Sequence, residues 1–247
     1  VTQEGDGDVY GIKMQRHSEQ ELVYDEYYWL DFENAGADMN GNATTNIIVN
    51  NIGNGDVYGV RMYGGTENIW ADFVNGDTYA DTDDAEGNSN VTSTATIKIN
   101  NTGNGDVYGI RTDSIIGGNT HNAYAYSRAG ENKYATATAR GVVDITNSGN
   151  GNVYGVWGGN SSATNATGYA WIDEDGQTAN AKATGRIHLV NSENSNANMY
   201  GMYADYNIEN AVAYPSDAGT TAKATGVINL INKGSGNAYG KPCKGSS

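Results

Sequence analysis

Small or apolar residues alternate with polar residues in five segments of the chain. In one of them Ala137, Ala139, Gly141, Val143 and Ile145 occupy every second position. A period of two is typical of a β-strand that is buried on one side. We call these the A segments, and we expect their other side to face solvent. They span 43–50, 93–100, 137–147, 181–191 and 222–232, and the expected outward residues include Arg140, Asp144, Lys182, Arg186 and His188.

A second pattern, a Gly/Asn-rich turn followed by a Val-Tyr-Gly-like core, recurs six times. These B segments span 5–12, 53–60, 103–110, 149–156, 195–202 and 234–241. Each contains one anchor tyrosine, and successive anchors are 48, 50, 46, 46 and 39 residues apart. A recurrence of this length indicates a repeat architecture. The anchors are Tyr10, Tyr58, Tyr108, Tyr154, Tyr200 and Tyr239.

Aromatic residues are concentrated in a third kind of segment, the C segments, which follow the B segments. They span 22–32, 67–74, 121–127, 167–173 and 209–215. A polar turn then leads to the next A segment, so each unit is predicted to contain three short strands. We therefore expect a single repeat domain over residues 1–240, made of about five B-C-A units, and a tail at 241–247.

Three strands per unit, stacked unit on unit, predict an all-β repeat fold. A parallel β-solenoid with units of 46–50 residues is the first expectation. Its interior would be a narrow column of Ala, Val, Ile and Tyr, with the anchor tyrosines in an internal or half-buried ladder. Asn and Thr at equivalent turns can form hydrogen-bonded ladders between coils. The turns between A and B segments would also suit antiparallel hairpins, so a β-propeller or another antiparallel β array is the alternative.

The composition agrees with this repeat only when it is considered position by position. Leu, Ile, Val and Phe number 38 of 247 residues, and the formal net charge is −15. As bulk values, less than roughly 20% of these residues together with high net charge is typical of disordered chains. The periodic patterns instead place most of these few residues at equivalent positions. The 34 Gly and only four Leu argue against a helical protein.

Charge and hydropathy limit the possible partners. The chain holds 29 Asp and Glu against 14 Lys and Arg, whereas nucleic acids and anionic membranes require clustered basic groups. No apolar run of the sequence approaches the roughly 20 residues of a membrane span. We therefore expect no nucleic acid partner and no membrane insertion of this chain.

No set of residues points to catalysis. The three histidines lie in different units, no nucleophile motif is present, and the single cysteine, Cys243, lies in the tail. Acidic residues cluster in turns before the A segments, where oxygen-rich loops can bind calcium, although solvated loops that prevent aggregation are the simpler interpretation. We expect no enzyme activity, no catalytic residue, and no metal or cofactor unless calcium binds at Asp81, Asp83 and Asp84.

The aromatic residues of the C segments are the candidates for binding. Stacked units would align some of them into a stripe, and flat rings give sugars or partner proteins a large contact area at little entropic cost. Simple packing between units is the competing interpretation. The predicted stripe contains Trp70, Tyr124, Tyr126, Tyr169, Trp171 and Tyr214.

The segments GNGDVYGI at 103–110 and AKATGVINLIN at 222–232 resemble the Gly/Asn-rich repeats in the passenger regions of bacterial autotransporters and related surface adhesins. The resemblance covers nearly the whole chain, but its motifs specify a low-complexity β repeat rather than one protein. It implies a secreted, right-handed β-helical stalk at a bacterial surface, commonly adhesive or self-associating. It implies no catalytic residues.

We therefore expect an extracellular structural or adhesive repeat protein of the bacterial cell surface. Its expected partners are other copies of itself, in an end-to-end filament, or other cell-surface proteins and glycans. A carbohydrate-binding or carbohydrate-cleaving β-helix that uses the acidic turns is the alternative. An enzyme of this kind needs one unit that breaks the repeat with converging acid and base groups, whereas a scaffold does not.

Overall fold

The computed structural model describes residues 1–16, 29–31, 39–64, 72–82, 88–113, 119–129, 134–159, 162–172, 178–204, 208–215 and 221–241. The regular secondary structure of these ranges consists of β-strands. No helix in them is long and apolar enough to cross a membrane. The strands form three sheets, which we name A, B and C after the segments that supply them.

Each sheet collects the equivalent strands of successive repeats. Sheet A contains β1 (Thr2–Gln3), β4 (Met39–Asn51), β7 (Ser89–Asn101), β10 (Tyr134–Asn147), β13 (Thr178–Asn191) and β17 (Thr221–Asn232). Sheet B contains β2 (Val9–Arg16), β5 (Val57–Gly64), β8 (Val107–Asp113), β11 (Val153–Gly158), β14 (Met199–Ala204) and β18 (Ala238–Tyr239). Sheet C contains β3 (Trp29–Asp31), β6 (Asp72–Thr82), β9 (Asn119–Ala129), β12 (Ser162–Ile172), β15 (Ile208–Glu209) and β16 (Val212–Pro215).

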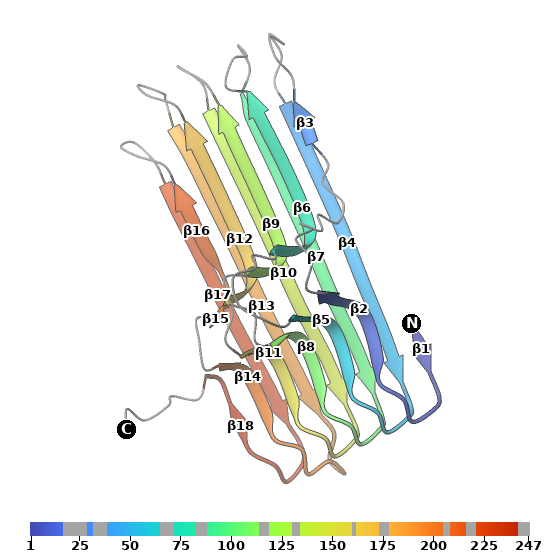
Figure 1. The fold of residues 1–247 in the computed structure, drawn as a ribbon. Helices are drawn as coiled ribbons and strands as arrows, with labels where there is room; N and C mark the ends of the chain where they lie inside the picture. The colour runs from blue at the N-terminus through green and yellow to red at the C-terminus, as the bar shows by residue number, and fades with distance from the viewer. Residues whose placement is uncertain are drawn as a thin grey trace.

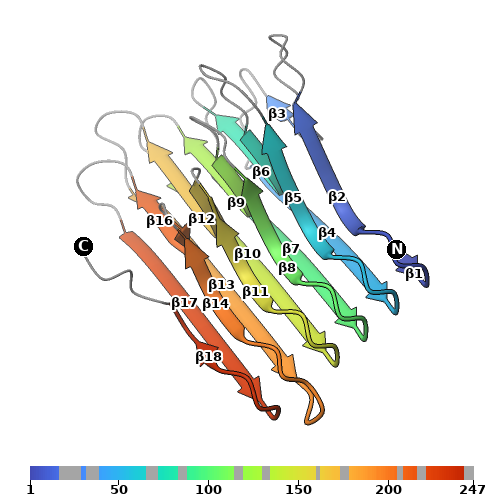
Figure 2. The same ribbon diagram turned by 60° about the horizontal axis from the view of Figure 1, so that its bottom comes forward.

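The pairing within these sheets is parallel throughout the described residues. Equivalent residues of successive repeats lie side by side, so that Val49, Ile99, Ile145, Leu189 and Leu230 form one row across sheet A. Figures 1 and 2 show the resulting stack, in which the coils follow one another in chain order from blue to red. The protein is a parallel β-solenoid, as the repeat predicts.

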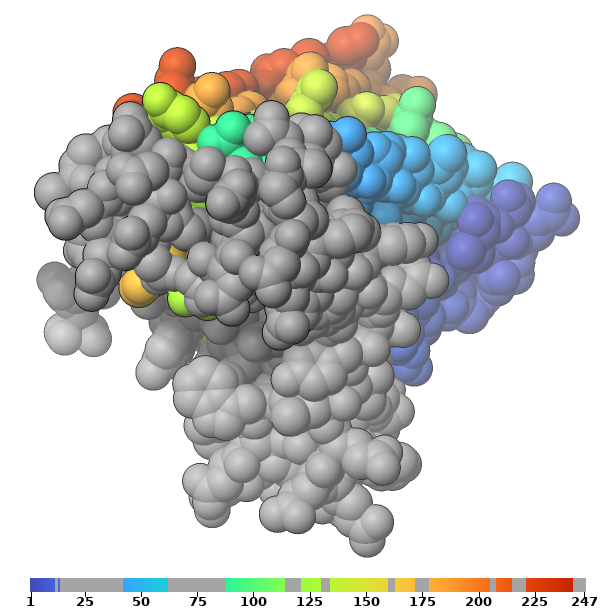
Figure 3. Space-filling view, turned by 90° about the horizontal axis from the view of Figure 1, so that it is seen from above, coloured from blue at the N-terminus to red at the C-terminus, as the bar shows by residue number. Residues whose placement is uncertain are grey.

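The antiparallel alternative is wrong for a simple reason. The Gly/Asn turns after the A segments do not close hairpins; they carry the chain from a strand of sheet A to a strand of sheet B in the opposite layer. Each strand then finds its hydrogen-bonding partner in the preceding and following coils. Figure 3 looks at the stack from above, and its colours again pass from the N-terminal to the C-terminal coils.

Each coil has two layers of unequal make-up. The long strand of sheet A forms one layer, and the strands of sheets B and C together cover it. In β10 the inward residues near the end of the strand, Val143 and Ile145, pack in one cluster with sheet B residues such as Val153. The inward residues near its start, among them Ala137, pack in a second cluster with sheet C residues such as Ala166. We call these two parts of the interior the aliphatic half and the alanine half.

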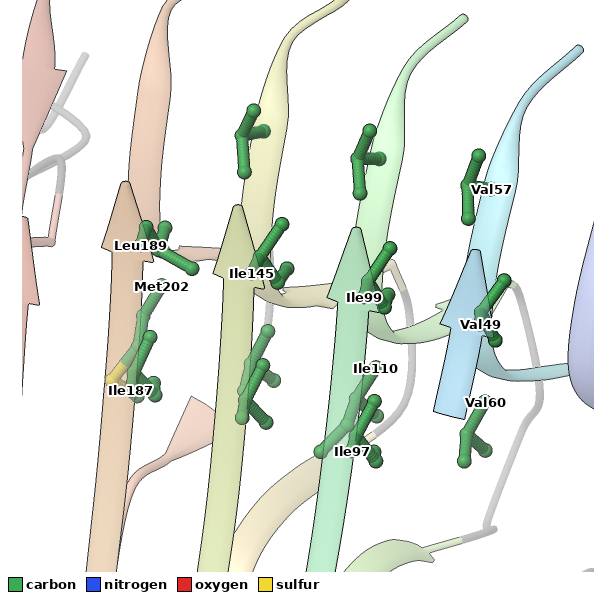
Figure 4. Packing of buried hydrophobic residues seen from close by; sticks show 14 of the residues in the cluster. Val49, Val57, Val60, Ile97, Ile99, Ile110, Ile145, Ile187, Leu189 and Met202 are labelled. Atoms are coloured by element: carbon green, nitrogen blue, oxygen red, sulfur yellow. The ribbon is translucent and has the colours of Figure 1, made fainter. Parts of the chain in front are cut away.

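The aliphatic half is built from rungs of branched side chains. Val49, Ile99, Ile145 and Leu189 lie at one level on successive strands of sheet A, as Figure 4 shows, and all are 0% exposed. Inward residues of sheet B, such as Ile110, face them. Burial of branched aliphatic side chains stabilises a core by roughly 1.5–3 kcal/mol each. This part of the coil is therefore the main source of hydrophobic stabilisation.

The alanine half brings the two layers much closer together. Its buried cluster consists of alanines and one valine, Val91. At Gly185 of β13 an added Cβ atom would lie 1.7 Å from the backbone oxygen of Asn210, and at Gly141 of β10 it would lie 1.9 Å from that of Asn165. Contacts this short leave no room for a side chain. At Gly141 and Gly185 the approach of sheet C therefore requires glycine.

The glycine of the Val-Tyr-Gly core has a related cause. Val107 and Ile110 of β8 are both buried in the aliphatic half although they are three residues apart, so the strand breaks its alternation between them. The register of sheet B skips Gly109 at this point. An added Cβ atom there would lie 2.3 Å from Cγ1 of Val143 and 2.5 Å from the oxygen of Gly155. Glycine is characteristic of such bulged, closely packed strand positions.

A buried ladder of asparagines closes the aliphatic half at the turn between sheets A and B. Each side-chain amide donates a hydrogen bond to the Oδ1 atom of the asparagine in the next coil, at N···O distances of 2.8, 2.8, 3.0 and 3.2 Å. The first three amides also donate to the glycine carbonyl two residues further along their own coil. The predicted ladders between coils are confirmed in Asn51, Asn101, Asn147, Asn191 and Asn232.

The strands differ from the predicted segments mainly in sheet C. β6 begins at Asp72, whereas the predicted C segment of that unit spans 67–74. The register aligns Tyr79, not Trp70, with Tyr126 of the following coil. Of the predicted segment 22–32, the described part is β3 at its end. The A segments, in contrast, lie inside the strands of sheet A.

Candidate functional surfaces

The anchor tyrosines form one continuous column on sheet B. Neighbouring ring centroids are 4.9, 5.1, 4.8, 4.9 and 5.2 Å apart, and the ring planes are inclined by 14° or less. The expected half-buried ladder is therefore present. Tyr58 is 2% exposed and Tyr108 is 6% exposed, whereas Tyr239 at the last coil is 41% exposed. Parallel stacking in register gives every ring a neighbour on both faces except at the two ends of the column, where one face has none.

Hydroxyl groups of this column are held by acidic residues two positions earlier. Tyr10, Tyr58 and Tyr108 donate hydrogen bonds to Asp8, Asp56 and Asp106 at 3.1, 3.1 and 3.2 Å. Burial raises the pKa of Tyr58 and Tyr108 well above 10, and the nearby aspartates raise it further. Burial, followed by the charge of Asp106, raises the pKa of Tyr154 to about 12. Tyr58, Tyr108 and Tyr154 are thus neutral at physiological pH.

Two arginines cover the middle of the column. The guanidinium carbon of Arg61 lies 4.6 Å from the ring centroid of Tyr58, and that of Arg111 lies 4.6 Å from that of Tyr108. Asp113 accepts from Nε of both arginines, at 3.0 and 2.8 Å. Contacts of a guanidinium with a ring face are favourable by roughly 0.5–2 kcal/mol. The two arginines therefore explain why Tyr58, although it lies on the outer side of the sheet, is almost fully buried.

The cation network also ties neighbouring coils together. Arg111 donates through Nη1 to the hydroxyl of Tyr58 in the preceding coil at 3.4 Å, and Arg61 donates to that of Tyr10 at 3.3 Å. This network was not predicted, although a basic residue follows three of the anchor tyrosines by three positions, at Lys13, Arg61 and Arg111. Its charged groups already bind one another, so it acts as a clamp between coils.

The predicted aromatic stripe is brought together in part. Tyr126, Tyr169 and Tyr214 share one register position of sheet C. The ring centroids of Tyr126 and Tyr169 are 5.2 Å apart with planes 7° from parallel, and Tyr214 lies 6.0 Å from Tyr169 with a tilt of 43°. Trp171 lies beside Tyr169 with a centroid distance of 6.2 Å. These four residues form what we call the sheet C aromatic row.

The other members of the stripe lie elsewhere. Tyr124 lies two residues before Tyr126, opposite Thr167, and contacts His121 edge to face, at 5.3 Å. Trp70 lies outside the described residues. The structure instead places the backbone of Tyr79 at the register position of Tyr126, and that of Trp29 beside Tyr79. This unit has aromatic residues at both Trp70 and Tyr79. Only the pairing between coils shows that Tyr79 is the one aligned with Tyr126.

The stacking of the sheet C aromatic row limits what it can bind. A ring whose two faces are covered by neighbours presents only its edge, whereas sugars bind best against an open ring face. Tyr214 is 47% exposed and Trp171 is 36% exposed, whereas Tyr169 is less exposed than either. The end of the row at Tyr214 and Trp171 is therefore the part best suited to contact a ligand.

The predicted calcium residues and the histidines add no described site. Asp81 belongs to β6 through its backbone, while Asp83 and Asp84 lie outside the described residues. Among the side chains that the structure describes, no three His, Cys, Asp or Glu residues gather as a metal site would require. His121 pairs with the hydroxyl of Thr167 at 2.9 Å, and Nδ1 of His188 pairs with Nδ2 of Asn229 at 3.0 Å.

The comparisons with known proteins identify no family, so the protein is classified by its fold. No known family matches the sequence, and neither the curated proteins nor the solved structures contain a significant match. The chain is a parallel β-solenoid with stacked asparagine and tyrosine ladders.

Proposed function

We propose that this chain is a structural and adhesive repeat protein of a bacterial surface, extracellular and without enzymatic activity. Repetition is the observation that carries the proposal. The buried amides, the tyrosine column and the sheet C aromatic row recur from coil to coil in the described residues rather than converging in one coil. Such a scaffold suits a function that uses an extended surface. The resemblance to the passenger regions of surface adhesins supports the same function.

Surface display tests the proposal. The chain would be displayed on a bacterium that does not adhere, beside the same bacterium carrying an unrelated β-solenoid of equal length. We expect the chain to increase cell retention on host cells or on polysaccharide-coated surfaces above that control. Unchanged retention, together with turnover of a polysaccharide by the purified chain, would overturn the proposal.

End-to-end association is the second part of the proposal, and both ends of the buried asparagine ladder support it. The side-chain oxygen of Asn51, at the first rung, has no hydrogen-bond partner in the described residues although Asn51 is 1% exposed. At the last rung, β17 pairs only with β13 among the described strands. A donor such as the amide of Asn232 from a second copy would continue the ladder at Asn51, and repeated head-to-tail contacts of this kind give open filaments.

The short strand β1 stands in the way of this contact. Thr2 and Gln3 pair with Asn50 and Asn51, which is the position that the end of an incoming β17 would occupy. We therefore expect removal of residues 1–4 to promote association, measured by light scattering after size-exclusion chromatography over a wide concentration range. A matched variant without residues 242–247 is the control. Monomers at every concentration in the shortened chain would rule out this assembly.

A carbohydrate-binding protein is the second candidate function, and the exposed rings of Trp171 and Tyr214 favour it. Neutral oligosaccharides should then quench tryptophan fluorescence in the parent and in W157A, but not in the double variant W171A/Y214A. Quenching that survives in the double variant would contradict binding at this row. A carbohydrate-cleaving protein would show polysaccharide cleavage that is lost when Asp81, Asp83 and Asp84 are replaced by Asn. We expect the parent protein to show no such cleavage.

A further inference from the structure

The outer face of sheet A has a charge opposite to that of the rest of the chain. Its strands carry five cations and one anion, Asp144, and thus a net charge of +4. The whole chain has a net charge of −15, so the remainder carries −19. All five cations are exposed. They are Lys98, Arg140, Lys182, Arg186 and Lys223, and we call this surface the basic face.

The register arranges four of these cations along a diagonal. Lys182 and Lys223 lie side by side on β13 and β17. On β10, Thr138 pairs with Lys182, and Arg140 lies two residues after Thr138. On β7, Thr92 pairs with Thr138, and Lys98 lies six residues after Thr92. With about 4.8 Å between strands and about 3.3 Å per residue, the diagonal is about 24 Å long. Arg186 lies beside it on β13.

The fold gains little from this arrangement. Lys98 lies opposite Asp144, the one anion of the face, but none of the five cations forms an ion pair at contact distance with a residue that the structure describes. Lys182 and Lys223 are directly opposite each other, and like charges at such positions destabilise a sheet. The residues between the cations are mainly polar, such as Thr94, Thr184 and Thr225, which share one row. A face that gathers cations at a cost in stability, with hydroxyl groups between them, is suited to bind an anion.

We propose that the basic face binds an anionic polysaccharide with carboxylate or sulfate groups. The inference rests on the proposed adhesive function and names its partner. A thin, extended polymer with a charge on every one or two sugar rings matches cations that are about 5–14 Å apart on this diagonal. The threonine hydroxyls and asparagine amides of the face can hydrogen-bond to the sugar hydroxyls.

The distribution of charge favours a polysaccharide over a duplex or a membrane. Duplex DNA carries one charge per about 1.7 Å of its axis, which five separated cations match poorly. In the sequence, Asp83 and Asp84 precede β7, and Asp173, Glu174 and Asp175 precede β13. The chain outside the basic face carries a net charge of −19, which repels a broad anionic partner. A single polymer chain can follow the diagonal alone, because at physiological ionic strength charges more than about 8 Å away are largely screened.

Binding to immobilised polysaccharides tests the inference with the full chain. The probes are alginate and dextran sulfate, with neutral dextran as the reference. The double variant R140E/K182E changes the face, and K233E/K241E is the matched control, because both change the net charge from −15 to −19. Reversal of two cations should weaken binding at least about tenfold, whereas the control should bind like the parent. Binding should also weaken as NaCl is added. All four side chains are exposed, so neither variant should unfold.

Three outcomes would overturn the inference. These are equal loss in both variants, equal binding of neutral dextran, and stronger binding of a short DNA duplex or of vesicles that contain phosphatidylglycerol. The surface display assay separates this failure from that of the proposed function. If R140E/K182E still promotes cell retention, adhesion stands and the basic face is not its site. If the parent binds alginate but does not promote retention, the polysaccharide site stands and adhesion fails.

Discussion

The two halves of each coil hold their layers together by different means. Between sheets A and B, branched side chains such as Ile145 and Ile187 keep the layers apart and fill the space. Between sheets A and C, alanine and glycine let the layers approach until the backbone of Asn165 occupies the space beside Gly141. The first half depends on apolar area, and the second depends on close fit and hydrogen bonds. A substitution should therefore have opposite consequences in the two halves: loss of volume harms the aliphatic half, and added volume harms the alanine half.

The largest effect is expected from one added methyl group in the alanine half. Gly185→Ala places a Cβ atom against backbone, which cannot move aside as a side chain can, so the layers must separate. We expect a loss of about 4 kcal/mol in the free energy of unfolding, above the usual range for overpacking. Gly226→Ala is the matched control, since its Cβ atom would meet only side-chain atoms of Asn210, at 3.3 Å. Urea denaturation followed by circular dichroism measures both, and equal losses would refute the close fit.

Loss of volume should have its largest effect in the aliphatic half. Ile145→Ala removes a fully buried side chain from the central rungs and should cost about 3 kcal/mol. Ala137→Gly, at an inward position of the same strand in the alanine half, should cost only about 1 kcal/mol. The same denaturation measurement compares them. If the alanine half proved the more sensitive to lost volume, the division of the core would be incorrect.

Hydrogen bonds of the alanine half can be tested through Asn165. Its amide donates to the carbonyls of Gly141 and Arg186 and to Oδ1 of Asn210, at 3.1, 3.3 and 3.0 Å. Asn165→Ala leaves buried carbonyls without a donor and should cost about 2 kcal/mol. Asn104→Ala provides the control in an exposed ladder, where its amide pairs with Asn54 and water can replace it. Amide hydrogen exchange should show faster opening of β12 in the first variant alone.

The sheet C aromatic row should contribute less to stability. Tyr169 stacks on Tyr126, and Tyr169→Ala should cost about 1 kcal/mol through lost ring contacts. A loss near zero would mean that the row serves binding rather than packing. Tyr169→Leu retains most of the apolar contact and separates stacking from simple burial. Thermal unfolding of the three proteins measures the difference.

The tyrosine column should affect the stability least at neutral pH. At alkaline pH its contribution to the free energy of unfolding should change clearly. The pKa of Tyr154 is raised to about 12 by burial and then by Asp106, so its folded form keeps a proton that the unfolded form loses near pH 10. This stability is fully present below pH 10 and is lost as the pH rises toward 12. Tyrosinate absorbance should rise together with the loss of circular dichroism. Ionisation of the buried tyrosines well before unfolding would contradict the stacked, buried column.

The sheet A strands could be predicted well from the sequence because their burial follows a strict period of two. The same alternation that places Val143 and Ile145 in the core is visible in the sequence. The alignment of sheet C was harder to predict, since the unit with Trp70 also contains Tyr79 and only hydrogen bonding between coils selects one of them. The parallel solenoid was predicted, but the unequal halves were not, because alanine and glycine alone do not reveal how closely a second layer approaches.

The candidate surfaces were predictable to different degrees. Tyr126, Tyr169 and Tyr214 follow from the repeat spacing, and the structure aligns them. The basic face was not predicted, although Arg140, Lys182 and Arg186 were expected on the outward side of their strands. The sequence distances between its cations exceed 40 residues for most pairs, and charge counted along the chain shows only an excess of acid. Parallel register places residues that are distant in the sequence side by side, so a basic surface can form on a chain whose net charge is negative.

The parallel register of the coils also sets how much length and how much surface each coil adds to the protein. A coil of 46–50 residues advances the axis by one strand spacing, about 4.8 Å, so the fold uses roughly ten residues for each ångström of height. An α-helix gains about 1.5 Å from a single residue. A chain under selection for reach would not be built this way. What each added coil supplies is surface: a strip on each of the three sheets, so that a small gain in length comes with a large gain in exposed area.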